Sequence, residues 1–162
     1  MNKAEPLKLY YSDLNELFKL SSQYMTNNVE FCSLVNARNG KCSQNCKYCA
    51  QSSHYLTDIE DYPLIDKKEA IKAALEAKKN GAIRFAIVTS GKSPDEENFD
   101  KILDLIDEIN KTEGIRSCAS IGILNEEQAK LLAKHGLKRF HHNINTAESY
   151  YNEVCTTHSW QD

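Results

Sequence analysis

Three cysteines, Cys42, Cys46 and Cys49, lie within eight residues in a polar stretch that follows the apolar run 31–35. A four-iron cluster held by protein alone normally takes four thiolates, so three imply either a distant fourth ligand or one iron left open to bind another molecule. We favour a 4Fe-4S cluster with the open iron. A tetrahedral zinc site with His54 as fourth ligand is the main alternative, although paired C-x-x-C sequences would fit zinc better. Three unrelated thiols form the third interpretation, which the polar surroundings disfavour because structural cysteines are usually buried.

The rest of the chain alternates strand-like and helix-like segments, which predicts the α/β class with parallel strands. The expected elements are a helix after Ser12, strand 31–35, a helix from Asp66 to Gly81, strand 83–88, a helix through 99–109, strand 115–121, a helix from Asn125 to Gly136, strand 137–144 and a helical start at Ala147. Asp66 is expected to cap its helix, with Glu69 three residues later as in a capping box. Between the first strand and second helix, residues 36–54 are expected to form a long functional loop.

About four such strands make half of a (β/α)8 TIM-type barrel, which needs roughly 250 residues. We therefore expect an N-terminal helical extension over residues 1–30 and an incomplete barrel over residues 31–162. An open flavodoxin-like sheet is the alternative architecture. In either case the carboxyl ends of the strands are expected to carry the chemistry, and the cysteine loop follows the end of the first strand.

Composition narrows the class of protein. The chain has 162 residues, 41% of them hydrophobic, and a formal net charge of -3, which predicts an ordinary globular core and no basic surface for nucleic acid. Its apolar stretches are too short to span a membrane, and its start lacks the apolar segment of a secretory signal. We expect a cytoplasmic protein whose six cysteines are thiols and not disulfides.

Several stretches resemble a known family. The Cys42-x-x-x-Cys46-x-x-Cys49 spacing is similar to the signature of the radical S-adenosylmethionine (SAM) superfamily, and residues 46–52, Cys-Lys-Tyr-Cys-Ala-Gln-Ser, resemble the biotin synthase family within it. Further similar stretches occur in the expected order, at residues 36–42, 81–85, 88–92, 142–146 and 155–158.

The resemblance implies a radical SAM barrel whose open iron chelates SAM, and whose reduced cluster cleaves SAM to methionine and a 5′-deoxyadenosyl radical. The cluster and SAM carry this chemistry, so no catalytic side chain is expected, and the protein orients the reactants. The implied reaction converts dethiobiotin to biotin, with sulfur from an auxiliary iron–sulfur cluster such as 2Fe-2S. An electron donor such as flavodoxin or ferredoxin, and a homodimer of the full-length protein, are also implied.

The resemblance implies these roles residue by residue. Cys42, Cys46 and Cys49 would hold the 4Fe-4S cluster, and Cys118 an auxiliary cluster of uncertain type. The positions that would bind SAM are Tyr48, Thr89, Ser90, Gly91 and Asn145, and Asn143 would bind the substrate. Each also has an ordinary structural explanation, such as packing, a turn or a helix cap. Asn143 and Asn145 are two residues apart, so an extended segment would place them on one face.

Two positions depart from the family pattern. Ala86 stands in the second strand where two-iron biotin synthases have a cysteine, and Asn145 replaces a carboxylate. Alanine cannot bind iron, so the auxiliary cluster is bound differently, is of another type or is absent. A related radical SAM enzyme with another product, such as a maturase or a methylornithine-forming enzyme, is one alternative. An inactive truncated chain that binds a cluster or zinc through the same cysteines is the other.

The remaining cysteines and histidines have less specific interpretations. Cys32 lies in an apolar run, which predicts a small buried thiol, and Cys155 has no assigned role. His141 and His142 are neighbours on an expected strand, so at most one would point into a barrel, and packing or hydrogen bonding is the expected role.

Overall fold

In the computed structural model, which describes residues 4–26 and 28–162, the chain forms two units, residues 1–30 and residues 31–162. The described part of the first unit contains helices α1 (Ala4–Tyr10) and α2 (Leu14–Ser22). Helix α2 begins after Asp13, whose side chain accepts a hydrogen bond from the N–H of Asn15 at 2.8 Å. The predicted helix after Ser12 is therefore present, with Asp13 as its N-cap.

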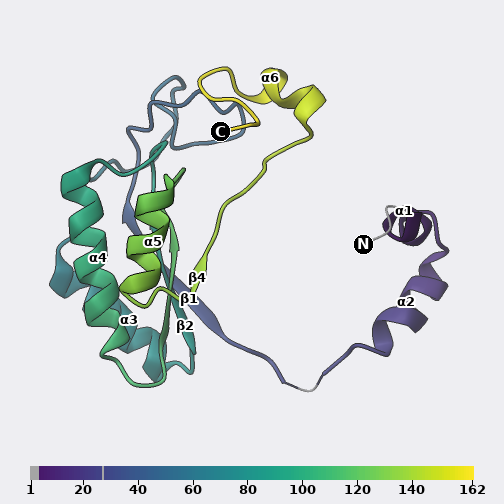
Figure 1. Ribbon diagram of the computed structural model, residues 1–162, viewed down its shortest axis with the longest axis horizontal. Helices are drawn as coiled ribbons and strands as arrows, with labels where there is room; N and C mark the ends of the chain where they lie inside the picture. Colours follow the sequence, from purple (N-terminus) through teal and green to yellow (C-terminus); the bar gives the residue numbers. More distant parts are fainter. Residues whose placement is uncertain (1–3, 27) are drawn as a thin grey trace. The chain divides into compact units, whose positions relative to one another are not determined.

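Four parallel strands form the sheet of the second unit (Figure 1). They are β1 (Cys32–Arg38), β2 (Arg84–Thr89), β3 (Arg116–Ser120) and β4 (Arg139–Phe140), and their order in the sheet is their order in the chain. This sequential order is that of a barrel wall, whereas a flavodoxin-like sheet reverses direction at its first strand. The prediction of a partial (β/α)8 barrel is thus confirmed over the flavodoxin alternative.

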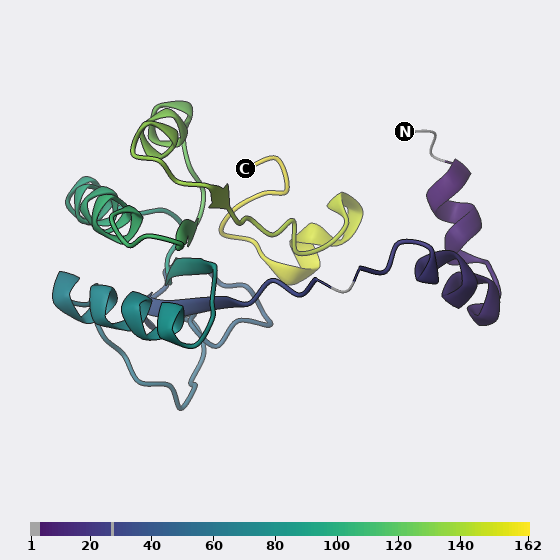
Figure 2. The same ribbon diagram turned by 90° about the horizontal axis from the view of Figure 1, so that it is seen from below.

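The helices that connect the strands lie on one side of this sheet, as Figure 2 shows. They are α3 (Lys67–Lys79), α4 (Glu96–Asn110) and α5 (Glu126–Lys134). Phe85 and Ile87 of β2 are buried in one core with Ile102 and Ile106 of α4. Because side chains alternate along a strand, Ala86, which lies between Phe85 and Ile87, faces the opposite side of the sheet.

The helix starts follow the sequence signals with one difference. Helix α5 starts at the predicted position, where Asn125 and Gln128 form a capping box with reciprocal bonds of 2.8 and 3.0 Å. Asp66 caps α3 as predicted, but its carboxylate accepts from the N–H of Lys68 at 2.7 Å, one residue before Glu69. The cap is present there without the reciprocal bond of a box.

Strand β4 is much shorter than the predicted strand 137–144. Among the strands that the structure describes it pairs with β3 alone, and a further backbone bond joins the N–H of His141 to the carbonyl of Ala119 at 2.8 Å. Beyond it Asn145 has φ 70°, which takes the chain out of the extended conformation. The following segment forms η1 (Glu148–Tyr150) and α6 (Tyr151–Val154).

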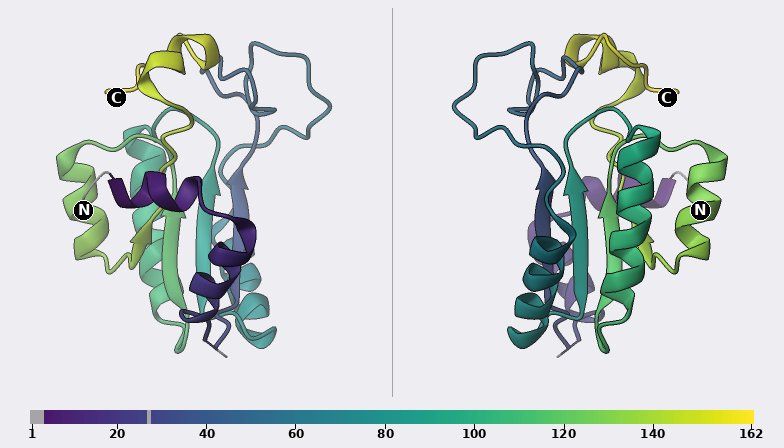
Figure 3. Two further views of the ribbon diagram at one scale, coloured as in Figure 1. Left: turned by 90° about the vertical axis from the view of Figure 1, so that its right-hand side faces the viewer. Right: turned by 90° about the vertical axis from the view of Figure 1, so that its left-hand side faces the viewer.

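The loop after β1 and the segment containing α6 lie together beyond the carboxyl ends of the strands (Figures 1 and 3). A backbone bond of 3.0 Å from Lys47 to Val154 joins them. This is the edge at which parallel α/β folds place their active sites. Among the described residues, no helix combines the length and the apolar character needed to cross a membrane.

Candidate functional site

The cysteine loop is shaped by its own backbone. The N–H of Cys42 donates to the carbonyl of Gln51 at 3.0 Å, and the N–H of Ser53 donates to the carbonyl of Cys42 at 2.8 Å. The N–H of Cys49 donates to the carbonyl of Cys46, also at 3.0 Å. These backbone bonds hold the three cysteines in one closed loop.

The three loop cysteines line one hollow of about 200 Å³. Four of the five predicted SAM-binding residues line it as well: Thr89, Ser90, Gly91 and Asn145. Ser90 connects the strand β2 end to the cysteine loop, because its hydroxyl donates to the carbonyl of Gly40 at 2.6 Å and its N–H to Arg38 at 3.0 Å. Tyr48 does not line this hollow, and 63% of it is exposed.

The sequence analysis assigned no binding role to the other residues of this hollow. They are Gln44, Gln51, Lys92, Gly122, Ile123 and His158, joined by His142, for which packing was expected. Gly122 has φ 89°, and a Cβ there would come within 2.3 Å of the carbonyl oxygen of Lys92. Only glycine allows the loop after β3 to approach the loop after β2 this closely. A lone glycine after a strand is a weak signal in sequence.

A second hollow, of about 380 Å³, lies on the sheet face opposite the helices. Its lining includes Cys118 and Asn143, but also Cys32, which is exposed and not buried. The prediction for Cys32 is wrong because β1 places this thiol, like Cys118, on the face that no helix of this unit covers. Asn143 and Asn145 line different hollows, because the positive φ of Asn145 breaks the alternation that would keep them together.

Charged groups adjust the acidity of the Cys118 thiol in this second hollow. Burial raises its pKa, and the positive charges of Arg84 and Arg139 partly offset that effect. Ala86 pairs with Cys118 in the sheet, and Leu34 of β1 pairs with Ala86. Two cysteines, two arginines and apolar residues of β1 and β2 therefore line the same hollow.

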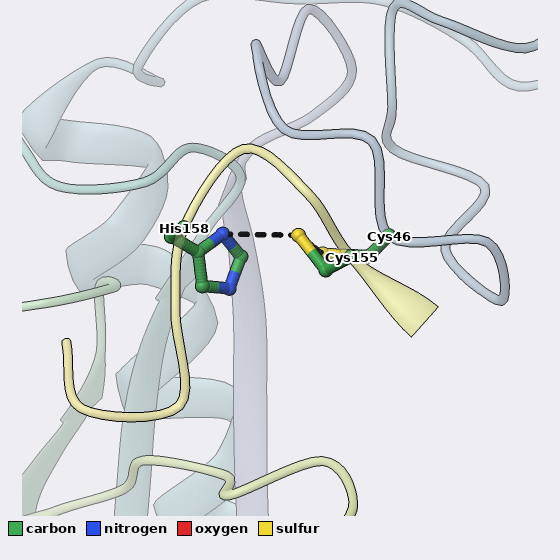
Figure 4. A group of neighbouring side chains, drawn as sticks. All are labelled: Cys46, Cys155 and His158. Carbon is green, nitrogen blue, oxygen red and sulfur yellow. Dashed lines mark hydrogen bonds between the residues drawn. The ribbon is translucent and has the colours of Figure 1, made fainter. Parts of the chain in front are cut away.

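Cys155 and His158 lie against the cysteine loop, a position that sequence reasoning did not predict. The sulfur of Cys155 is 3.7 Å from that of Cys46 and 3.2 Å from Nδ1 of His158 (Figure 4). The sequence places a cysteine and a histidine three residues apart in Cys155-Thr-Thr-His158, which is a possible sign of a metal site. Cys155 is 109 residues from Cys46 in the chain, so the contact between them could not be predicted from the sequence.

The two touching thiols differ in acidity. Burial, with the hydrogen bond to Cys155 and the charges of the other cysteines, raises the pKa of Cys46 to about 12. Burial would also raise the pKa of Cys155, but hydrogen bonds from Thr157, the backbone of His158 and the thiol of Cys46 outweigh it and lower that pKa. In the metal-free chain Cys46 is therefore the hydrogen-bond donor and Cys155 the acceptor.

Neighbouring side chains share this electrostatic environment. Partial burial and the charges of Cys46 and Cys49 raise the pKa of Tyr48 to about 12. Burial and the positive charge of Lys92 lower the pKa of His158. His54, the predicted fourth zinc ligand, has its Nε2 3.1 Å from the carbonyl of Ser43, and it does not line the cysteine hollow.

The donor set fits a four-iron cluster. Thiolate sulfur is the ligand that such clusters take, and three thiols here face one hollow. In the described part of the chain, the Cys, His and carboxylate atoms that all lie within 4.8 Å of one another are those of Cys46, Cys155 and His158. The three loop cysteines do not form so tight a group, as expected for ligands of three separate irons and not of one ion.

Residues 38–162 match the model of the radical SAM superfamily, and the chain belongs to that superfamily. It is similar to curated biotin synthases. That of Acetivibrio thermocellus is 45% identical over 144 residues, which are 89% of this chain and 45% of the relative. That of Clostridium tetani is 42% identical over 157 residues, which are 94% of this chain and 48% of the relative. The chain thus spans about half the length of these relatives.

Solved structures agree on the fold. The FeFe-hydrogenase maturase HydG superposes with a TM-score of 0.77 and 22% identity, over 95% of this chain and 36% of HydG. Methylornithine synthase (PylB) superposes with a TM-score of 0.73 and 18% identity, over 96% of this chain and 48% of PylB. At these identities the likeness establishes a shared fold only, and the reaction has to be inferred from the residues of the site.

Proposed function

We propose that this chain carries the SAM-cleaving site of a biotin synthase, the radical SAM enzyme that inserts sulfur into dethiobiotin to form biotin. One observation carries the proposal: Cys42, Cys46 and Cys49 face a single hollow together with the end of strand β2 and Asn145. The identity of up to 45% to biotin synthases over most of the chain favours this product over those of other superfamily members.

Each part of the site has a role in this proposal. The three cysteines hold a 4Fe-4S cluster, which when bound supplies the electron that cleaves SAM. The backbone and hydroxyls of Thr89, Ser90 and Gly91 bind the amino acid part of SAM at the strand end. Asn145 and Tyr48 contact its ribose and adenine. The chain's own groups thus orient SAM and exclude water from the hollow.

The second hollow is the proposed place of dethiobiotin and of an auxiliary iron–sulfur cluster. Cys118 provides one thiolate, and Cys32 lines the same hollow, so a second thiol stands near the position where Ala86 replaces the family cysteine. Asn143 provides an amide for the ureido ring of the substrate. An electron donor such as flavodoxin or ferredoxin, a homodimer of the full-length protein and a cytoplasmic location complete the proposal.

Anaerobic reconstitution with iron and sulfide tests the first site. We expect a four-iron absorption spectrum and, after reduction, an electron paramagnetic resonance signal that changes when SAM is added. Cys49→Ala should abolish the SAM-dependent change, whereas Cys32→Ala should retain it because Cys32 lines the other hollow. A wild-type signal that ignores SAM, or equal behaviour of the two variants, would overturn the assignment.

Iron content tests the second site. Replacing Cys118 or Cys32 by serine should reduce the iron bound per chain while the SAM-dependent signal persists. Iron content that is unchanged in both variants would remove the auxiliary cluster from the proposal.

A further inference from the structure

Three ligand atoms from two distant segments meet beside the cluster loop: Sγ of Cys46, Sγ of Cys155 and Nδ1 of His158. We propose that the cluster-free chain binds one zinc ion through these three side chains. Because Cys46 is also a cluster ligand in the proposed function, on which this part rests, zinc and the four-iron cluster would exclude each other.

The spacing of the two sulfurs is that of ligands on a single ion. Two thiolates bound tetrahedrally to zinc at about 2.3 Å are separated by about 3.8 Å. The observed separation of Cys46 and Cys155 is 3.7 Å. Terminal thiolates of a four-iron cubane bind different irons and therefore stand much farther apart. The pair thus has the geometry of a mononuclear site without any movement of the backbone.

The histidine needs only a small adjustment. A sulfur and a nitrogen on one tetrahedral zinc are about 3.6 Å apart when Zn–N is about 2.0–2.1 Å, and Cys155 Sγ is 3.2 Å from His158 Nδ1. In the metal-free chain Nδ1 also lies 2.9 Å from Oε1 of Gln44. On binding zinc, Nδ1 exchanges that hydrogen bond for the metal and carries no proton.

The surrounding structure holds the ligands in place. Cys155 is buried, and its sulfur lies 3.4 Å from both Oδ1 of Asn45 and Oγ1 of Thr157. The bond from Lys47 to the carbonyl of Val154 fixes the two segments next to Cys46 and Cys155. Figure 4 shows the imidazole of His158 directed at the Cys155 sulfur. Little order has to be created on binding, which favours affinity.

The charge balance also suits zinc. Zn²⁺ displaces the protons that the two thiols carry, and two thiolates with a neutral imidazole leave the complex uncharged. A three-ligand zinc site keeps one position for water, which can enter from the hollow that His158 and Cys46 line. His54 has no part in this site because its ring contacts the carbonyl of Ser43.

Metal binding to the reduced, cluster-free chain tests the proposal. Zinc affinity is measured by competition with a chromophoric chelator, and Co²⁺ is used as a spectroscopic substitute that reports tetrahedral thiolate ligation. Cys155→Ser and His158→Ala should each weaken zinc binding by at least about tenfold. Cys42→Ser and Cys49→Ser should bind zinc like the wild type, although they lose the cluster. Cys46→Ser should lose both metals.

These variants separate this proposal from the proposed function. If Cys49→Ser weakens zinc binding as much as Cys155→Ser does, the ion sits on the cluster loop and the assignment is wrong. If a stoichiometric amount of zinc fails to block cluster assembly, mutual exclusion is wrong. If no cluster assembles but the zinc pattern holds, the proposed function fails and the zinc site stands. Circular dichroism of each variant confirms that a loss of binding is not a loss of fold.

Discussion

The side chain of Asn45 binds both the backbone and the side chain of Thr156. The N–H of Thr156 donates to Oδ1 of Asn45 at 2.9 Å, and Nδ2 of Asn45 donates to the Thr156 hydroxyl at 2.6 Å. Thr157 and Cys155 also contact Oδ1. One amide in the middle of the cysteine loop thus holds a segment 111 residues away. The position of the cluster loop therefore depends on the segment that follows α6.

Replacing Asn45 by alanine should loosen this attachment. The change removes several hydrogen bonds, but these are exposed and water replaces part of each, so we expect the unfolding free energy to fall by about 1–2 kcal/mol in total. The reconstituted cluster should also be lost faster, because the loop that carries Cys46 is less constrained. Urea unfolding and the decay of cluster absorbance measure the two effects. The exposed Asn152, changed to alanine, is the control, and equal effects of both changes would refute the role of Asn45.

Gly122→Ala should destabilise the rim of the cysteine hollow. The new methyl group would overlap the carbonyl of Lys92 and sit at a positive φ, which together cost about 2–3 kcal/mol. Gly81→Ala is a matched control, since Gly81 has φ 88° and a Cβ there would meet nothing within 4 Å, so only the backbone term of about 1 kcal/mol applies. Gly122→Ala should therefore lower the midpoint of thermal unfolding more than Gly81→Ala does. A smaller loss for Gly122→Ala would contradict the close approach.

The pKa of Cys46 predicts a loss of stability at alkaline pH. Its pKa rises from 9.0 in the unfolded chain to about 12 in the fold. Below pH 9 both states hold the proton, so the full stability is present. As the pH rises toward 12, the thiol ionises first in the unfolded chain, so stability falls. The unfolding equilibrium constant should rise by less than tenfold per pH unit, because solvent screens the site.

Urea unfolding of the reduced, metal-free chain between about pH 8 and pH 10.5 measures this effect. Cys46→Ser is the control because serine does not ionise in this range, while Tyr48 and Cys155 are present in both chains. We expect the wild-type curve to fall more steeply with pH than that of the variant. Parallel curves would show that Cys46 titrates normally.

Sequence reasoning recovered the elements whose signals are local. The helix start at Asn125 depends on residues close in the chain, and the α/β class follows from the order of strands and helices. It failed where the decisive contact is distant. Cys32 was misjudged because its apolar neighbours suggested burial, whereas exposure depends on which sheet face lacks helices. The contact of Cys155 with Cys46 depends on how α6 meets the loop, which no local pattern encodes.

The sheet face that carries the second hollow predicts how the 162-residue chain behaves in solution. Leu34 of β1 is 62% exposed on that face, and β1 and β4 each pair with a single strand in the sheet. Open strand edges and an apolar face favour association with another copy. We expect concentration-dependent oligomers in sedimentation velocity. Leu34→Lys should shift these oligomers toward monomer, because a charge on this face opposes its burial against another copy.

Leu75→Lys provides the comparison for this change. Leu75 is 51% exposed and lies in α3, on the helical side of the sheet. A lysine there adds the same charge and removes a similar apolar area, so general solubility changes equally in both variants. If the strand face drives association, only Leu34→Lys lowers the sedimentation coefficient. A monodisperse wild-type monomer, or an equal response of both variants, would mean that this face is not the one that associates.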